Sequence, residues 1–507
     1  MQTIRIKILN PVWSIAQDSF SREFVEPILT YEREYWEELE YGKKRTPYTQ
    51  TLLTRSGKFL SGLIPRISET YKELPCLDKD RFSLKIEEPY YDLFETHISK
   101  PHLKGITLRE DQIKLLNDIL LSRRGVIKAP ARSGKTVIAG ALISMFKVKT
   151  LFACPTIDIL QQTKEEFTKF GFDVGMIGKG KKEYDNQIIV STYQSINRFS
   201  EQYLSTFKIL IVDECHHLSD NGNTLVKALR WCFAPVRIGF TATIHKDKGS
   251  LMTMEGMLGP VIGEITSGEA IKIGIIAKPK LKLLKAPRNP DIKKLTYTDS
   301  YKIGITRSRA RNRLITKTAK DCIDRGQTVL ILVTRVEHGF NLKDMFNLLY
   351  PDIDVPFICG GVDIETQKQI KRLRKQSEKL YHAGMSSTQT YKDTIEDLKF
   401  LEEIKKRVDK LSKSRNEYRK ALNAGLFQCI IATNIWNEGV NIPNLNVLIN
   451  AAGGKSEIST IQMASRSLTA TTEKKYGLII DIFDDSNNYF ISHFGERICL
   501  YMEEGWI

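Results

Sequence analysis

Long apolar runs, paired cysteines and low-complexity tracts are all missing from this chain of 507 residues. No apolar run approaches the roughly 18–20 residues that a membrane-spanning helix needs, so we expect no association with a membrane. The eight cysteines are scattered singly, without a CxxC pair, which excludes a disulfide framework and the common zinc spacings. The first residues alternate apolar and polar side chains, unlike a secretory signal. These absences predict a protein of a reducing cytoplasm.

Acidic residues are also comparatively few. The chain has 60 Asp and Glu against 76 Lys and Arg, which leaves a formal net charge of +16. A positive excess of this size favours a polyanionic partner, most often nucleic acid. Simple solubility is the alternative that the charge alone leaves open.

Short apolar runs alternate with helical stretches from residue 107 onward, which is typical of parallel sheets built from βαβ units. The first series of expected strands is Arg124–Lys128, Thr150–Cys154, Gln187–Ser191, Ile209–Val212 and Val236–Phe240. The second series is Thr328–Val333, Val355–Cys359, Gln428–Ala432, Asn446–Asn450 and Gly477–Ile482.

The sequence therefore predicts an α/β fold with two tandem parallel-sheet domains. A segment with two prolines and little periodicity separates them, so it is interpreted as a linker. The N-terminal part has a different composition, rich in Tyr, Trp and basic residues, and is expected to form a small accessory domain. The predicted divisions are 1–104 (accessory, DNA-binding), 105–281 (first α/β domain), 282–299 (linker) and 300–507 (second α/β domain).

A charged, helix-prone insertion of about residues 363–422 interrupts the second α/β domain. Leu401, Ile404, Val408 and Leu411 follow the spacing of an amphipathic helix. We expect a helical hairpin here. Its charged surface is either a functional attachment or simply a solvated face, and the sequence does not decide between them.

A phosphate-binding loop is predicted where an expected strand ends and a helix begins. Backbone N–H groups at a helix N-terminus form a concavity that favours anions. In this interpretation Lys135 neutralises the β- and γ-phosphates, Thr136 ligates Mg²⁺, and Gly134 lets the backbone approach the ligand. The predicted loop comprises Ala129, Pro130, Ala131, Arg132, Ser133, Gly134, Lys135 and Thr136.

An acidic pair, Asp213 and Glu214, follows the buried strand at 209–212. Acidic residues at the carboxyl end of a parallel strand face the ligand crevice. We expect Asp213 to hold Mg²⁺ through water and Glu214 to orient or deprotonate the attacking water. His216 suggests a metal ligand at first sight, but no second ligand cluster is present, so coupling or strand packing is preferred.

Together these residues resemble superfamily 2 helicases of the DExH type, and further elements fit in order over residues 107–482. The resemblance implies two RecA-like domains, ATP as the nucleotide and Mg²⁺ as its metal. It implies adenine contacts from Arg109 and Gln112 and a nucleotide contact near Gly439. Nucleic-acid contacts are implied for Pro155, Ser191, Thr192 and Thr433. Thr241–Thr243 resembles the element that couples hydrolysis to movement.

The last motif departs from the family pattern. Gln462 and Arg466 are present and are the implied catalytic residues of the second domain, whereas Ser465 replaces a glycine and Thr469 replaces an arginine. An arginine there stabilises charge on the transferring phosphoryl group. Arg466 or a nearby lysine is expected to compensate, and otherwise hydrolysis is slow.

Segments outside these motifs resemble UvsW-like phage helicases and their XPB- and RecG-type relatives. The clues include Tyr301–Ile305, Arg309, Arg311, Asp481–Asp485 and Arg497. The resemblance implies an ATP-dependent DNA translocase that remodels branched or forked DNA, acting as a monomer in the cytoplasm, or in the host cytoplasm if phage-encoded. An RNA helicase and a nucleic-acid clamp with weak or lost ATPase activity are the alternatives.

Overall fold

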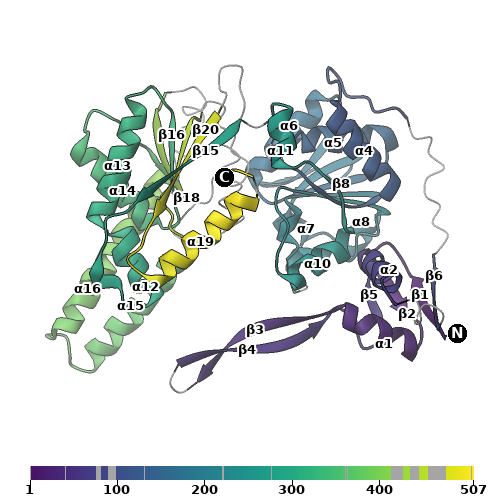
Figure 1. Cartoon of the computed structure of the whole chain (residues 1–507), viewed down its shortest axis with the longest axis horizontal. Coiled ribbons are helices and arrows are strands. Elements are labelled where there is room, and N and C mark those ends of the chain that lie inside the picture. Colours follow the sequence, from purple (N-terminus) through teal and green to yellow (C-terminus); the bar gives the residue numbers. More distant parts are fainter. Residues whose placement is uncertain are drawn as a thin grey trace. The chain divides into compact units, whose positions relative to one another are not determined.

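The computed structural model describes residues 2–39, 42–75, 81–88, 99–130, 132–219, 222–275, 277–359, 361, 364–412, 426–433, 445–454, 476–503 and 505–507. The chain divides into two compact units, Met1–Thr266 and Ser267–Ile507. Each unit contains a parallel sheet covered by helices (Figure 1). Within the described residues, no helix is both long enough and apolar enough to cross a membrane.

The main sheet of the first unit has the strand order β10-β9-β11-β8-β12-β13-β7-β14. The described strands pair in parallel except β10 with β9. The five strands expected from the sequence lie within one residue of observed strands. The bounds are β7 (Arg124–Lys128), β8 (Thr150–Cys154), β9 (Val174–Gly178), β10 (Lys181–Lys182), β11 (Ile188–Thr192), β12 (Ile209–Asp213), β13 (Val236–Thr241) and β14 (Val261–Glu264).

Helices cover both sides of this sheet, which explains why its central strands are apolar throughout rather than alternating. In Figure 1, α4, α5 and α6 lie on one side of β8, and α7 and α10 lie on the other. The bounds are α4 (Glu110–Ser122), α5 (Lys135–Phe146), α6 (Ile157–Lys169), α7 (Tyr193–Ile196), α8 (Glu201–Ser205), η2 (Cys215–His217), α9 (Thr224–Leu229) and α10 (Lys248–Leu258). Because the strands are parallel, the loops that follow β7, β8, β11, β12 and β13 meet at one edge.

The N-terminal residues form a second, four-stranded sheet of order β5-β2-β1-β6 and a two-stranded hairpin of β3 and β4. Each strand of the hairpin has 10 residues, and the hairpin projects from the rest of the unit (Figure 1). The bounds are β1 (Gln2–Ile8), β2 (Trp13–Ala16), α1 (Ser19–Ile28), β3 (Thr30–Leu39), β4 (Gly42–Thr51), β5 (Lys58–Leu60), η1 (Ser61–Leu63), α2 (Ile64–Lys72) and β6 (Phe82–Glu87).

The expectation that residues 1–104 stand apart as a separate domain is corrected by their packing. Apolar residues of the N-terminal sheet and of the main sheet of the first unit belong to one continuous core. Arg66 pairs with Glu255 on α10, with 2.6 Å between Nη2 and Oε2, and Arg124 Nη1 donates to the Pro11 carbonyl at 3.1 Å. A β-carbon on Gly62 would lie 2.0 Å from the Glu255 carbonyl oxygen. The accessory layer is therefore packed directly onto α10.

The second unit has a parallel sheet of order β15-β20-β19-β16-β18-β17. The five strands expected here are all present, although β17 is shorter than predicted. The strands are β15 (Lys278–Lys285), β16 (Val329–Val333), β17 (Phe357–Ile358), β18 (Cys429–Thr433), β19 (Val447–Asn450) and β20 (Tyr476–Phe483). The helices are α11 (Ser267–Lys272), η3 (Pro290–Ile292), α12 (Tyr297–Tyr301), the π-helix η4 (Lys302–Thr306), α13 (Arg309–Ile323), α14 (Val336–Leu349), α15 (Ile364–His382), α16 (Gln389–Ser412) and α19 (Asn488–Glu503).

The linker expected over 282–299 is wrong in its first part. All eight residues of β15 pair with β20, and the division between the units falls after Thr266 rather than after residue 281. The alternating Lys and Leu side chains of β15 suit an edge strand, and Pro279 is tolerated at such an edge. The prolines that suggested a linker, Pro287 and Pro290, lie beyond the strand.

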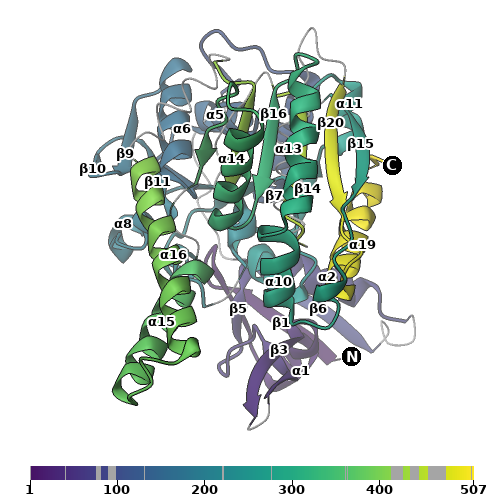
Figure 2. The ribbon, with the colours of Figure 1, turned by 90° about the vertical axis from the view of Figure 1, so that its left-hand side faces the viewer.

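The helical hairpin expected within 363–422 is present as α15 and α16, which pack side by side (Figure 2). Leu401, Ile404 and Val408 are at most 4% exposed and join the core of the second unit. The predicted apolar stripe is therefore the face by which α16 attaches to the domain. The two helices also pair through Arg374 and Glu402, whose Nη2 and Oε1 atoms are 2.7 Å apart.

Candidate nucleotide-binding site

The loop between β7 and α5 passes twice through left-handed backbone, at Arg132 with φ 67° and at Gly134 with φ 85°. Gly134 caps the N-terminus of α5, and a β-carbon there would lie 2.2 Å from Nε2 of Gln112. The positive φ therefore favours glycine, and any larger residue would also have to displace the Gln112 amide group. The first N–H groups of α5 have no acceptor within the helix, so the loop is suited to bind phosphate.

Lys135 connects this loop to the end of β12. Its Nζ donates to the Ala129 carbonyl at 3.3 Å and lies 3.9 Å from Glu214 Oε1. Asp213 is the last residue of β12, and Glu214 follows it with a left-handed φ of 50°. The structure thus brings the predicted lysine and the predicted glutamate together, although 79 positions separate them in the chain.

Thr136 and Asp213 offer the kind of atoms that Mg²⁺ prefers, a hydroxyl and a carboxylate oxygen. Thr136 lies in the first turn of α5 and Asp213 at the end of β12, so both belong to the carboxyl edge of the same sheet. A nucleotide-bound Mg²⁺ is usually held by one or two protein oxygens together with substrate phosphates. The donor chemistry of these two residues fits that requirement.

The Tyr193 hydroxyl contacts the backbone of the acidic pair. Its hydroxyl donates to the Asp213 carbonyl and lies 3.4 Å from the Glu214 carbonyl oxygen. Burial, and then the nearby Asp213, raises the pKa of Tyr193 well above its ordinary value, so the hydroxyl keeps its proton and remains a donor. No sequence pattern indicates this role, because Tyr193 precedes Asp213 by 20 residues without a recognisable spacing.

His216 joins the acidic pair to the next strand. Its Nδ1 lies 3.4 Å from Glu214 Oε2 and 3.0 Å from the hydroxyl of Thr241. That hydroxyl donates to the Thr243 carbonyl at 2.8 Å. No cluster of three or more potential metal ligands exists among the described residues. His216 thus links Glu214 to Thr241, and the role in coupling or strand packing expected of it stays a prediction.

Arg109 and Gln112 both attach to the phosphate-binding loop. Arg109 Nη2 and Gln112 Nε2 donate to the Ser133 carbonyl at 2.7 and 3.2 Å. Gln112 Oε1 accepts the Arg109 backbone N–H at 3.1 Å, and the Gln112 side chain is buried. Asp111 holds the Arg109 guanidinium at 2.8 Å. The adenine contact expected of Gln112 stays a prediction, and the structure adds a link from this residue to the loop.

The four residues expected to contact nucleic acid differ in accessibility. Pro155 is partly exposed directly after β8, and Thr192 caps α7, accepting the Ser195 backbone N–H at 3.3 Å. Ser191 is fully buried, and its hydroxyl donates to the Ile177 carbonyl at 3.0 Å. The nucleic-acid contact expected of Ser191 stays a prediction, and the structure adds that its hydroxyl is engaged in the core. Thr433 ends β18 and is 6% exposed.

Several predicted residues lie outside the part of the chain that the structure describes. They are Ala131 of the phosphate-binding loop, Gly439, and the last motif with Gln462, Ser465, Arg466 and Thr469.

Two family models match the chain. Residues 105–246 match "Type III restriction enzyme, res subunit" and residues 385–470 match "Helicase conserved C-terminal domain". The chain is 26% identical over 407 residues to "DNA 3'-5' translocase XPB2" of Sulfurisphaera tokodaii, covering 79% of this chain and 86% of the relative. It is 22% identical over 420 residues to "ATP-dependent DNA helicase uvsW" of Enterobacteria phage T4, covering 76% of this chain and 73% of that relative.

The chain is a superfamily 2 helicase of the UvsW and XPB type. This confirms the resemblance inferred from the motifs and the expected enzyme class, a helicase that hydrolyses ATP. A fragment of a putative HsdR subunit of a type I restriction enzyme from Vibrio vulnificus has the same fold, with a TM-score of 0.54 and 16% identity, covering 77% of the helicase and 67% of the fragment. The predicted fold class of two RecA-like domains is thereby confirmed.

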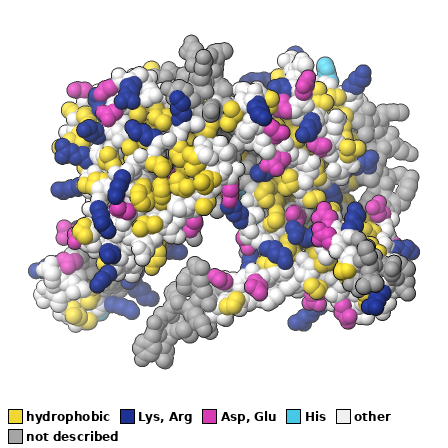
Figure 3. Space-filling model, viewed as in Figure 1, with side chains coloured by type: hydrophobic (Ala, Val, Ile, Leu, Met, Phe, Trp, Pro, Cys, Tyr) yellow, Lys and Arg dark blue, Asp and Glu magenta, His cyan; other side chains and the backbone are white. Residues whose placement is uncertain are grey.

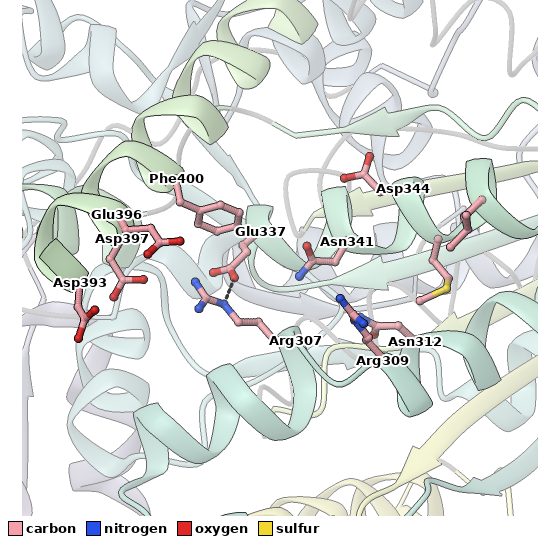
Figure 4. Close-up of a pocket in the computed structure, with 12 residues that line it drawn as sticks. Arg307, Arg309, Asn312, Glu337, Asn341, Asp344, Asp393, Glu396, Asp397 and Phe400 are labelled. Carbon is pink, nitrogen blue, oxygen red and sulfur yellow. Dashed lines mark hydrogen bonds and ion pairs between the residues drawn. The ribbon is translucent and has the colours of Figure 1, made fainter. Parts of the chain in front are cut away.

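A separate cavity of about 820 Å³ lies in the second unit of the helicase, where α16 meets α13 and α14 (Figure 4). None of the described nucleotide-site residues lines it. The Arg307 side chain forms part of the cavity wall and pairs there with Glu337. Its guanidinium carbon lies 5.1 Å from the centroid of the Phe400 ring. The cavity therefore marks the joint at which the helical hairpin rests on the second domain.

Proposed function

We propose that this helicase moves along DNA by hydrolysing ATP and remodels branched or forked DNA, by fork unwinding and Holliday-junction branch migration, in recombination, repair or replication. Both relatives described above are named as DNA motors. The observation that carries the branched-DNA proposal is the continuous core between the ATPase sheet and the N-terminal layer. A projecting hairpin fixed to the motor in this way would be carried into a DNA junction by each ATP-driven movement.

At the nucleotide, Lys135 and the first N–H groups of α5 bind and neutralise the phosphates. Glu214 orients the attacking water and accepts its proton, as positioning and charge stabilisation supply most of the catalysis in phosphoryl transfer. When bound, Mg²⁺ would be held by Thr136 and Asp213 and would offset phosphate charge. The family resemblance also implies nucleotide roles for Gly439, Gln462 and Arg466, which lie outside the described residues.

Contacts with the DNA backbone would come from the loops at the carboxyl edge of the two sheets. Thr156 caps α6 and Thr192 caps α7, so two helix N-termini present N–H groups next to Pro155 and Thr192. Such groups bind phosphate without reading the base sequence. Thr433 would add a contact from the second domain. We propose a monomer, which sedimentation in the presence and absence of DNA would test.

The decisive experiment compares ATP turnover without nucleic acid, with single-stranded DNA, with forked DNA and with RNA. We expect the largest stimulation by forked DNA and no turnover by Lys135→Ala. Stimulation by RNA alone would favour an RNA helicase. No stimulation by any nucleic acid would favour a clamp with a weakened ATPase, for which Thr469 in place of arginine is the sequence argument.

Salt dependence tests the backbone-gripping part of the proposal. On the face that Figure 3 shows, Lys and Arg side chains are spread over both units rather than gathered in one patch, and the net charge is +16. Each phosphate that is neutralised contributes about 0.9 to the slope of log affinity against log salt for duplex DNA. We expect the affinity for forked DNA to fall with salt, with a slope of several units in the plot of log affinity against log salt. Affinity that does not change with salt would contradict binding through the DNA phosphates.

A further inference from the structure

The helical hairpin of the second unit carries its positive charge on one of its two helices. Helix α15 contains six Lys and Arg against two Asp and Glu, whereas α16 contains six of each. Five of the six basic residues of α15 are exposed and follow the three- and four-residue spacing of a single helix face. We call these five residues the basic stripe: Lys368, Lys371, Arg372, Lys375 and Lys379.

The basic stripe lies opposite the face by which α15 packs. At 3.6 residues per turn, its five residues cover roughly 100° of the helix surface. The buried residues of α15 are Thr366, Ile370 and Ser377, and the same periodicity places them on the other side of the helix. Helix α15 packs along α16 (Figure 2). The basic stripe therefore faces away from the partner helix and toward solvent.

The charges of the basic stripe are not compensated within the hairpin. None of the five side chains forms an ion pair with a carboxylate in the part of the chain that the structure describes. The sixth basic residue of α15, Arg374, does so with Glu402 of α16. Three pairs within the basic stripe are four positions apart, and like charges at that spacing destabilise a helix. The free protein thus holds a self-repelling surface.

Helix α16 shows what a solvated helix of the same hairpin looks like. Its exposed Lys399 precedes Glu403 by four positions, and its exposed Lys405 precedes Asp409 by the same interval. Opposite charges at this spacing stabilise a helix. Since α15 and α16 are both open to solvent, solubility alone does not account for the difference between them. The excess on α15 has the character of a surface that is neutralised by a polyanion.

The dimensions and composition of the basic stripe favour the phosphate backbone of a duplex. Its residues extend over about 17 Å of the helix axis, and duplex DNA carries one negative charge about every 1.7 Å. Several phosphates are therefore within reach of one rigid helix. Proteins that hold single strands add aromatic side chains on which the bases stack, and the basic stripe contains none.

We propose that the basic stripe of α15 binds the phosphate backbone of duplex DNA, such as a double-stranded arm of a fork, without reading its sequence. This inference rests on the DNA substrate proposed above and adds a binding surface that lies outside the nucleotide site. Phosphates on the stripe replace its mutual repulsion by attraction and release counterions from the DNA. Binding at this surface is therefore strongly dependent on salt.

The test compares two variants of the full chain that lose the same charge from the same hairpin. The stripe variant carries Lys368→Gln, Arg372→Gln, Lys375→Gln and Lys379→Gln. The control variant carries four substitutions at exposed positions of α16, namely Lys392→Gln, Lys399→Gln, Lys405→Gln and Lys410→Gln. Affinities for labelled duplex and forked DNA are measured by fluorescence anisotropy over a series of salt concentrations, without nucleotide.

We expect the stripe variant to bind duplex DNA about tenfold more weakly or worse at about 0.1 M salt. The slope of log affinity against log salt should fall by about 0.9 for each lost phosphate contact, and Lys375→Gln alone should lower it by about 0.9. The control variant should stay within about threefold of wild type. Basal ATP turnover should be unchanged in both variants, because neither alters the nucleotide site.

Thermal unfolding separates loss of binding from loss of structure. The stripe variant should be at least as stable as wild type, because its like-charge neighbours are removed and Gln is nearly as good a helix former as Lys or Arg. Equal weakening of DNA binding by the stripe and control variants would overturn the proposal, because net charge alone would then explain it. Wild-type affinity of the stripe variant would also overturn it and would favour an acidic protein as the partner of this face. If the wild-type chain bound no duplex or forked DNA, the proposed DNA substrate would be overturned as well.

Discussion

The carboxylate of Glu214 faces the imidazole of His216, with 3.4 Å between Oε2 and Nδ1. The same nitrogen lies 3.0 Å from the Thr241 hydroxyl, and so the predicted water-orienting glutamate and the predicted coupling element share one histidine. His216 is therefore a direct contact between the end of β12 and β13.

Replacing His216 should uncouple hydrolysis from DNA movement. In His216→Ala we expect basal ATP turnover to stay within a few-fold of wild type, while the number of base pairs unwound per ATP falls about tenfold, because the link from Glu214 to Thr241 is lost. Parallel measurements of phosphate release and strand separation give this ratio. The exposed His102 supplies a matched His→Ala control, and equal losses in both activities of His216→Ala would contradict the coupling role.

Gly134→Ala should abolish nucleotide binding. The added β-carbon would meet Nε2 of Gln112 at 2.2 Å in a backbone with φ 85°, so the loop could form only by displacing its neighbour. Gly180→Ala is the matched control, because Gly180 has nearly the same φ of 83° but nothing within 4 Å of the added atom. Calorimetric titration with ATP should show no binding for the first variant and normal binding for the second.

Gly62→Ala should loosen the accessory layer from the motor. The new β-carbon would lie 2.0 Å from the Glu255 carbonyl oxygen and 2.6 Å from that of Gly256, and backbone atoms cannot move aside at low cost. We expect a loss of about 1–3 kcal/mol in the free energy of unfolding, seen as a lower melting temperature. Gly495→Ala is the control, because Gly495 lies on α19 with no atom within 4 Å of the added β-carbon. We expect this variant to leave the free energy of unfolding unchanged or slightly higher.

Acid should destabilise the second unit through His338, which is fully buried and shares a hydrogen bond of 3.0 Å with Asn312. Burial, and then Arg311, lowers the pKa of His338 well below 6.5. The unfolded chain therefore binds a proton that the folded chain does not, and stability falls as the pH drops below about 6.5, by at most about 1.4 kcal/mol per pH unit.

Melting temperatures of wild type and His338→Gln from pH 7.5 to 5.5 test this expectation. The glutamine does not titrate, so any advantage of the wild type at neutral pH should shrink steadily as the pH falls. Parallel melting curves for the two proteins over this range would show that His338 does not contribute to the acid sensitivity.

The linker and the accessory domain show where sequence reasoning stopped. The sequence places the second half of β15 in the predicted linker. Its partner β20 lies about 200 residues away, and pairing over that separation leaves no local pattern. Arg66 and Glu255 are likewise 189 residues apart. Ser191 followed the family motif, yet its burial depends on how β9 packs beside β11.

The sequence by itself determined the α/β class and the positions of most strands, and it predicted Lys135, Asp213 and Glu214 as the nucleotide residues. These features depend on local periodicity and on short motifs at strand ends, which a linear chain displays. The tertiary structure alone decided that the N-terminal layer shares a core with the motor and that Arg311 and Arg497 hold the end of β19 through backbone carbonyl groups. Both relationships arise from burial between distant segments, where desolvated charges and close-packed backbones meet only after the chain has folded.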